Sequence, residues 1–334
     1  MKFCKKTIAV IIAAAMLALC VPVFGVTEPE YPEVPEGYDG YITFGVSAIM
    51  MGWCYLLDPV LVPVHEGETL AAVTARAFDE YGIEYTANGT VEEGFYLTGV
   101  ACYEKDPMVP DYLMEQILAY PEWADEQFGY NFGGWTGNFV DDNMLSAYEY
   151  CDQAGWMFME DDVAPMDGAD VVQVKLGSVY TWFFSVYGWG MDYGVSDGWG
   201  SFPLFDNPME GVDRTEVSRV IALVSADDEL LELAFETAEE ELTALLELFY
   251  SPESSQEELD AALAAFLEAL GLGGEYEPGD VNMDGKLDSA DALLIMRCAM
   301  GVGSLSGAAL ELADYDGSGV VDMVDALLVL RAAM

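Results

Sequence analysis

Basic residues are scarce in this chain. Its 334 residues include 11 Lys and Arg against 60 Asp and Glu, which gives a formal net charge of −49. Proteins bind nucleic acid and anionic membrane surfaces through clusters of Lys and Arg, so the composition excludes both kinds of partner. The acidic excess favours solubility, which suits an extracellular protein.

Histidine is rarer still, and cysteine has no metal-binding spacing. His65 is the only histidine, and no two of the six cysteines form a CxxC pair, which argues against a zinc site. A Ser-His-Asp triad could use only His65, at a predicted turn between a strand and a helix. We therefore predict no catalytic residue, although the many acids leave open the carboxylate pair of an unrecognised hydrolase.

The N-terminus lacks an apolar run long enough to span a membrane. Residues 8–19 are apolar and follow three lysines, which predicts a secretory signal peptide over residues 1–25. We expect a secreted chain without a membrane span, preceded by a disordered, Pro- and Glu-rich leader over residues 26–39. Outside the cell the remaining cysteines could form disulfides, in pairings that the sequence does not determine: Cys54, Cys102, Cys151 and Cys298.

The most informative pattern is an internal repeat near the C-terminus. Residues 280–297 align with residues 314–331 without gaps, and eight of the eighteen positions are identical. Each copy begins with an Asp-rich stretch and continues as Ala-Leu-Leu, an apolar pair and Arg. Such self-similarity predicts two copies of one structural unit.

The Asp spacing in each copy predicts a calcium-binding loop. Calcium takes oxygen ligands from loop positions 1, 3, 5, 7, 9 and 12, around a Gly at position 6. The expected ligands of a first ion are Asp280, Asn282, Asp284, the carbonyl of Lys286, Asp288 and Asp291. Those of a second ion are Asp314, Asp316, Ser318, the carbonyl of Val320, Asp322 and Asp325. We therefore predict two calcium ions, with Leu287 and Val321 pairing the two loops.

Both loops depart from an EF-hand, because position 12 is Asp rather than Glu and no helix leads into the first loop. A loop followed by a helix, given twice over residues 280–334, resembles the dockerin domain of bacterial multi-enzyme complexes. The resemblance implies binding to a cohesin on a scaffolding or cell-surface protein, in the setting of polysaccharide degradation. By position, it places partner-binding residues at Ser289, Ala290, Met296 and Arg297, and at Met323, Val324, Leu330 and Arg331. Only the Arg recurs between the copies, which argues against two interchangeable faces.

Residues 40–205 combine strand-like runs with one helix. The first two strands are predicted to form a hairpin that turns at Asp58-Pro59, and an insertion over 108–142 is expected to hold a helix near 112–120. The other elements are a helix over 70–81 and strands over 41–49, 60–64, 95–100, 155–159, 171–176 and 180–187. This order predicts an α+β domain of β-grasp type.

Four stretches of this domain resemble a β-grasp domain of unknown function related to the C-terminal domain of transcobalamin: residues 64–70, 155–158, 168–169 and 182–194. The resemblance implies ligand binding and brings no catalytic activity. It departs from the family where Asp161-Asp162-Val163 replaces the usual Val-Asn-Gly. Gly-rich loops also carry aromatic residues that could stack on a glycan or could fill the core.

Residues 212–271 are rich in Ala, Leu and Glu, and residues 272–279 are a predicted linker. Helices are expected over 213–224, 227–249 and 255–270, the last with a capping box at its start. The stretch resembles the FIVAR module, a three-helix bundle of bacterial surface proteins, which implies a spacer.

Taken together, these patterns predict an α+β multidomain chain: a β-grasp-like domain, an all-α three-helix bundle and a small α dockerin with two calcium loop-helix repeats. We expect a secreted, non-catalytic component of a cellulosome-like or cell-surface complex that docks through calcium and cohesin. The alternatives are a carbohydrate-active hydrolase of unrecognised type and a carrier of a small, cobalamin-like ligand.

Overall fold

The computed structural model describes residues 31–128, 134–140, 142–188, 190–194, 211–272, 278–282, 287–300, 305 and 307–333. The predicted signal peptide, residues 26–30 of the leader and two predicted calcium ligands, Asp284 and Lys286, lie outside these residues. The described chain is a mixture of α-helices and β-sheets and forms two compact units. One comprises residues 31–231 with 249–253, and the other comprises residues 232–248 with 254–333.

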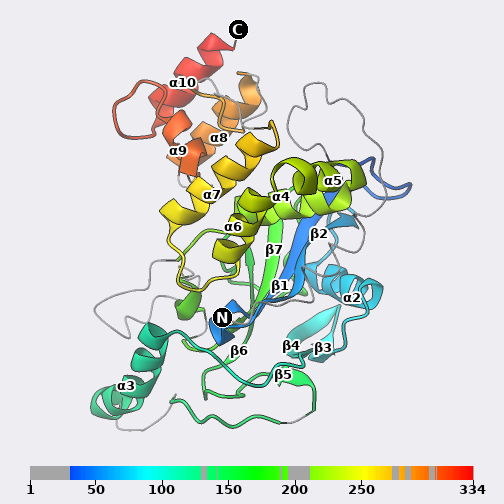
Figure 1. The fold of residues 1–334 in the computed structure, drawn as a ribbon, viewed down its shortest axis with the longest axis vertical. Coiled ribbons are helices and arrows are strands. Elements are labelled where there is room, and N and C mark those ends of the chain that lie inside the picture. Colours follow the sequence, from blue (N-terminus) through cyan, green and yellow to red (C-terminus); the bar gives the residue numbers. More distant parts are fainter. Residues whose placement is uncertain are drawn as a thin grey trace. The chain divides into compact units, whose positions relative to one another are not determined.

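The first unit is built on a four-stranded sheet in the order β2-β1-β7-β6 (Figure 1). Strands β1 (Gly40–Ser47) and β2 (Tyr55–Val64) form an antiparallel hairpin. Strand β7 (Val179–Ser185) runs parallel to β1, and β6 (Gly155–Glu160) pairs antiparallel with β7. The first and last strands of the unit are therefore neighbours at the centre of a mixed sheet.

The hairpin turns at a different place from the one predicted. The connection is a turn of 3₁₀ helix over Ile49–Met51, closed by Gly52 with a φ of 72°. A side chain at this position would also overlap the backbone of Met108. Pro59, expected in the turn, instead lies within β2 at an irregularity of the pairing with β1. Proline is tolerated there because a bulge of an edge strand needs no ladder donor.

Helix α2 (Leu70–Glu80) follows β2 and is capped by Thr69. The stretch 171–176, predicted to be a strand, makes only one bridge, between Thr69 and Gln173. Its backbone instead holds the start of α2, where the N–H of Leu70 donates to the carbonyl of Val172 at 2.9 Å. The apolar run of this stretch is therefore explained by a helix-capping loop.

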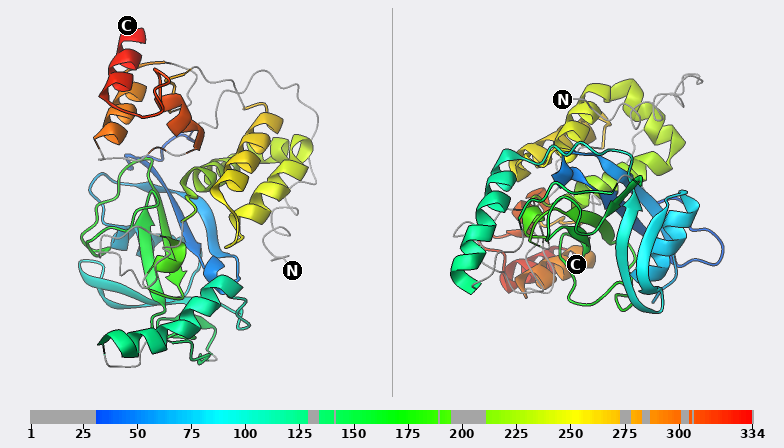
Figure 2. Two further views of the ribbon diagram at one scale, coloured as in Figure 1. Left: turned by 90° about the vertical axis from the view of Figure 1, so that its left-hand side faces the viewer. Right: turned by 90° about the horizontal axis from the view of Figure 1, so that it is seen from below.

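A second sheet has the order β3-β4-β5; its strands are labelled in Figure 1, and β3 and β4 are drawn in cyan in Figure 2. Its strands are β3 (Tyr85–Thr90), β4 (Glu93–Ala101) and β5 (Met144–Ser146). Only β4 was predicted, because β3 is polar and mostly exposed and β5 is very short. The insertion contains α3 (Asp111–Phe128), which runs beyond the predicted 112–120 and includes Pro121.

The helices that follow differ from the predicted set of three. They are α4 (Thr215–Ala226), α5 (Asp228–Thr237), α6 (Glu239–Phe249) and α7 (Gln256–Ala269). The expected middle helix is therefore two helices, divided at Ala238. Three glutamates occupy the first turn of α6, which is the charge that a helix N-terminus favours. Helix α4 packs against β1, β2 and β7 and belongs to the same compact unit as the sheet.

The C-terminal region contains α8 (Ser289–Ala299), α9 (Gly307–Ala313) and α10 (Met323–Ala332). Helices α8 and α10 pack together, and their shared small core is formed by Val281, Ala292, Ile295, Ala313, Ala326 and Val329. Gly279 has a φ of 95°, and a side chain there would collide with Val329 and Tyr315. Among the described residues no helix has both the length and the apolar character needed to cross a membrane.

Candidate functional site

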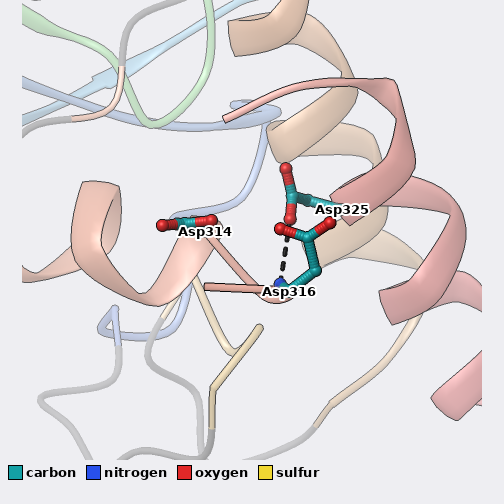
Figure 3. Close-up of side chains that lie close together, drawn as sticks. All are labelled: Asp314, Asp316 and Asp325. Carbon is teal, nitrogen blue, oxygen red and sulfur yellow. Dashed lines mark hydrogen bonds between the residues drawn. The ribbon is translucent and has the colours of Figure 1, made fainter. Parts of the chain in front are cut away.

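Three carboxylates of the second predicted loop come together between α9 and α10. An oxygen of each of Asp314, Asp316 and Asp325 lies within 4.8 Å of the others. Figure 3 shows Asp316 and Asp325 side by side, with Asp314 across the loop from them. These are positions 1, 3 and 12 of the predicted calcium loop. Carboxylate oxygens gathered in this way suit a hard cation such as calcium.

Asp325 joins this loop to the helix that follows it. The residue is fully buried, and its Oδ1 accepts from the backbone N–H of Asp316 at 3.1 Å while its Oδ2 accepts from that of Asp322 at 2.8 Å. Asp322 in turn caps α10 by accepting from the N–H of Val324 at 2.6 Å. Each carboxylate oxygen keeps further lone pairs, so Asp325 can hold the helix and bind a cation together.

Backbone donors fix the carboxylate at position 1. Asp314 accepts from the N–H of Ser318 at 2.9 Å and from that of Gly319 at 2.7 Å. Gly319 achieves this turn with a φ of 84°, as expected of the glycine at position 6. The Ser318 hydroxyl donates to the carbonyl of Val320 at 3.1 Å, so two further predicted ligands are adjacent. Carboxylates, a hydroxyl and a carbonyl are oxygen donors that fit calcium.

The described part of the first loop repeats these bonds. Asp291 is fully buried, and its Oδ1 accepts from the N–H groups of Val281 and Asn282 at 3.1 and 3.2 Å. Its Oδ2 accepts from the N–H of Asp288 at 2.8 Å, and Asp288 caps α8. Asp280 is also buried. In the two loops, Leu287 and Val321 both pack against the shared core.

The predicted partner residues lie mostly on the outer surface of α8 and α10. Seven are exposed: Ser289, Ala290, Arg297, Met323, Val324, Leu330 and Arg331. Met296 is the exception, because it packs against the shared core. Its exposure differs from that of the equivalent Leu330, whose side chain is 41% exposed.

Sequence reasoning missed two exposed leucines on the same helices. Leu327 of α10 is 65% exposed, and Leu293 at the equivalent position of α8 is 50% exposed. Leu327 is one turn beyond Met323 and one turn before Leu330, so the three share a helical face. This spacing could have identified the two leucines as surface residues. They belong, however, to the Ala-Leu-Leu that occurs in both copies, and a repeated apolar run is more often interpreted as part of the core.

His65 has a structural role. Its ring stacks on Tyr38 with 4.7 Å between centroids, and the guanidinium of Arg76 lies over the Tyr38 ring at 5.3 Å. Arg76 also forms an ion pair with Glu68 at 2.9 Å. This cluster holds the start of α2 against the N-terminal segment, which is a packing role rather than that of a general base.

The aromatic residues of the Gly-rich loops mostly fill the core. Trp156, Tyr187 and Tyr193 are buried, and Trp135 stacks on the buried Tyr150 with 5.8 Å between centroids. Trp189 and Trp199 lie outside the described residues. The buried rings of Trp156, Tyr187 and Tyr193 therefore offer no face on which a sugar could stack.

Comparison with known proteins agrees with the geometry of the C-terminal region. Residues 278–332 match the family described as dockerin type I domain. Searches of curated proteins and of solved structures gave no match to the chain. Dockerin domains of this type bind calcium, dock onto a cohesin and are typically extracellular or at the cell surface. The C-terminal residues 278–332 are therefore a dockerin type I domain, which implies calcium-dependent docking of this chain onto a cohesin.

Proposed function

We propose that this protein is a secreted, non-catalytic component of a cellulosome-like or cell-surface complex, attached through its dockerin to a cohesin. The observation that supports the proposal is that a candidate cation site lies directly beside a helix with an exposed apolar face. Asp325 connects the two, because its carboxylate lies near those of Asp314 and Asp316 and also accepts from the backbone N–H of Asp322 at the start of α10.

Calcium, when bound, would supply the positive charge that lets these carboxylates approach one another. The chain's own residues position the loop and the helix. Asp325 ties loop to helix, Asp314 is held by backbone donors, and the first turn of α10 then presents Met323 and Val324 to solvent. The equivalent bonds of Asp291 support a second ion in the first loop.

The two helices offer different faces to a partner. On α10 the exposed residues Met323, Val324, Leu327 and Leu330 are all apolar. On α8 the equivalent surface begins with Ser289 and Ala290, and only Leu293 is strongly apolar. We propose that α10 is the main docking face, because an exposed apolar group of this kind marks a protein contact site. The Arg of each copy, Arg297 or Arg331, would flank the contact.

The experiment that tests docking measures binding of the full chain to an immobilised type I cohesin. Binding is expected in excess calcium and lost in excess chelator. The variant Asp314→Ala with Asp316→Ala should bind weakly in calcium, whereas Asp227→Ala, which alters a loop of the first unit, should bind like the wild type. Equal binding with calcium and with chelator would argue against the proposal.

The role of residues 40–205 is a separate proposal. A mixed sheet with its first and last strands parallel and adjacent, and with a helix after the first hairpin, supports a β-grasp domain of the transcobalamin-like kind. Residues 212–271 would connect it to the dockerin as a FIVAR-like spacer. We propose that the domain binds a small molecule or glycan and serves polysaccharide degradation through the complex it joins. Ligand screening with a glycan array and with cobalamin would test this.

A further inference from the structure

The sheet face beneath α4 is more polar than the face beneath α2. Phe44 contacts Phe78 of α2 with 6.0 Å between ring centroids, so alternate residues of β1 face the other side. These are Thr43, Gly45 and Ser47, all buried. The Thr43 hydroxyl finds no hydrogen-bond partner in the part of the chain that the structure describes. Burial of this hydroxyl beneath α4 costs free energy, because no hydrogen bond within the described residues replaces those that it would make to water.

One edge of this junction is a turn with an unusual sequence. Asp161 and Asp162 link Glu160 to Val163 and have φ values of 46° and 63°. A two-residue turn with positive φ at both positions favours Asn-Gly. Hydrogen bonds explain the presence of Asp161 in this turn, because its carboxylate accepts from the Ser178 hydroxyl and the Val179 N–H, both at 2.8 Å.

Asp162 has no such bond to account for it. Within the described residues its carboxylate has no hydrogen-bond partner, and the residue is half-buried. It lines a cavity of about 10 Å³, enough for one water molecule. The rest of the lining comes from the sheet and from the start of α4: Met159, Val179, Thr181, Arg214, Thr215 and Ser218. A strained, half-buried carboxylate at such a place points to a role in how α4 docks.

The charged groups that face Asp162 both come from the start of α4. Burial and the neighbouring Asp213 carboxylate raise the pKa of Asp162 to about 7, against the opposing effect of Arg214. The Arg214 guanidinium is committed elsewhere, since it donates to the carbonyls of Val212, Phe249 and Ser251 at 3.1, 3.2 and 2.8 Å. The residues from the sheet that line the cavity beside Asp162 carry no charge.

We propose that α4 is an acid-stabilised latch on the sheet and that Asp162 is the residue that senses pH. When α4 is docked on the sheet, the Asp162 side chain lies in surroundings that favour its neutral form. When α4 is undocked, the carboxylate is exposed to water, and its pKa returns toward about 4. The pKa of Asp162 is higher with α4 docked than with α4 undocked. Docking is therefore tightest below about pH 4, weakens as pH rises to about 7, and changes little above that. Loosening of α4 uncovers the polar face of β1.

Hydrogen exchange of the α4 amides in the full-length, calcium-loaded protein tests this proposal. After correction for the chemical exchange rate, protection of residues 215–226 should fall by about tenfold or more between pH 5 and pH 7. In Asp162→Asn this decrease in protection should shrink to about twofold or less, because Asn accepts a positive φ but does not ionise. Asp162→Gly removes both the charge and the backbone strain, and its protection should respond to pH as that of Asp162→Asn does. The matched control is Asp167→Asn, an exposed acid on the following loop, which should keep the wild-type fall.

A second variant tests the contribution of Asp213, the acid beside Asp162. Asp213→Asn retains a side chain that can accept from the Thr215 N–H but removes the negative charge, so the decrease in protection of α4 should occur at lower pH. Burial also raises the pKa of Asp58 and of Asp192, and both groups are unchanged in Asp162→Asn, so a loss of the pH dependence in that variant assigns it to Asp162. Wild-type protection of α4 that is independent of pH, or a fall of equal size in Asp162→Asn, would overturn the proposal.

Discussion

The backbone N–H of Asp316 donates to the Oδ1 of Asp325 at 3.1 Å, and this bond links the third position of the second loop to its twelfth (Figure 3). In the first loop, Asn282 and Asp291 make the same bond at 3.2 Å. An Asp at position 12 is therefore suited to this fold, because its short side chain reaches both the loop amides and the start of the helix.

Calcium is expected to stabilise the dockerin helices. Without a cation, the carboxylates at 314, 316 and 325 repel one another within 4.8 Å, and the core they depend on is small. Chelator should therefore reduce hydrogen-exchange protection in α8 and α10 strongly and leave β1 and β7 unchanged. Equal protection of α10 with chelator and with calcium would contradict this expectation.

The two loops should differ in calcium affinity. Each loop has four Asp among its expected ligands, and the neutral side-chain ligand is Asn282 in the first loop and Ser318, at position 5, in the second. A hydroxyl is a weaker calcium ligand than an amide carbonyl. Calcium titration of Asp314→Ala reports on the first loop, and titration of Asp280→Ala reports on the second. We predict tighter residual binding in Asp314→Ala. The reverse order would show that ligand strength at position 5 does not set the ranking.

The first unit should lose stability as pH rises toward neutrality. Burial raises the pKa of Asp192 to about 7, so folding favours its protonated form. The contribution is full below about pH 4 and is lost as pH rises through about 7, at up to about 1.4 kcal/mol per pH unit. Asp192→Asn should flatten this slope in denaturant titrations at several pH values, whereas Asp167→Asn should not. A slope that is unchanged in Asp192→Asn would count against the assignment.

Arg214 should be important for stability rather than binding. Its buried guanidinium donates to the carbonyls of Phe249 and Ser251, so Arg214→Ala would leave both groups without these donors. We expect a loss of roughly 2–4 kcal/mol in the free energy of unfolding, measured with denaturant. The exposed Arg297→Ala is the control and should change stability by less than about 0.5 kcal/mol. A similar small effect for Arg214→Ala would refute its structural role.

The sequence predicted the dockerin domain, which the family match at residues 278–332 confirms, because the spacing of its acidic residues reflects their chemistry. Few folds need Asp and Gly at these fixed positions, and a second copy in register argues against a chance match. The sequence also predicted the hairpin β1-β2, helix α2 and strands β4, β6 and β7. Strand β3 was missed because its residues are polar, and the run at 171–176 was misread because apolar residues also serve capping loops.

Tertiary packing accounts for what local pattern could not show. The polar side of β1 is covered by α4, a helix that composition alone groups with α5, α6 and α7. Nothing in the local sequence of α4 distinguishes a helix that packs on a sheet from one that packs on other helices. Likewise, Ala-Leu-Leu predicts helix in both copies, but only the fold shows that Leu293 and Leu327 are exposed.

The most direct test of the account is the affinity of the full chain for a type I cohesin, measured by calorimetry in calcium for the wild type, Val324→Asp and Ala290→Asp. Calcium loading is verified for each protein beforehand. A charge at Val324, which is 49% exposed amid apolar neighbours on α10, should weaken binding by more than about 2 kcal/mol, and a charge at Ala290 on α8 should change it little. Loss of binding in Ala290→Asp alone would place the docking face on α8, and unchanged affinity in both variants would contradict docking through this dockerin.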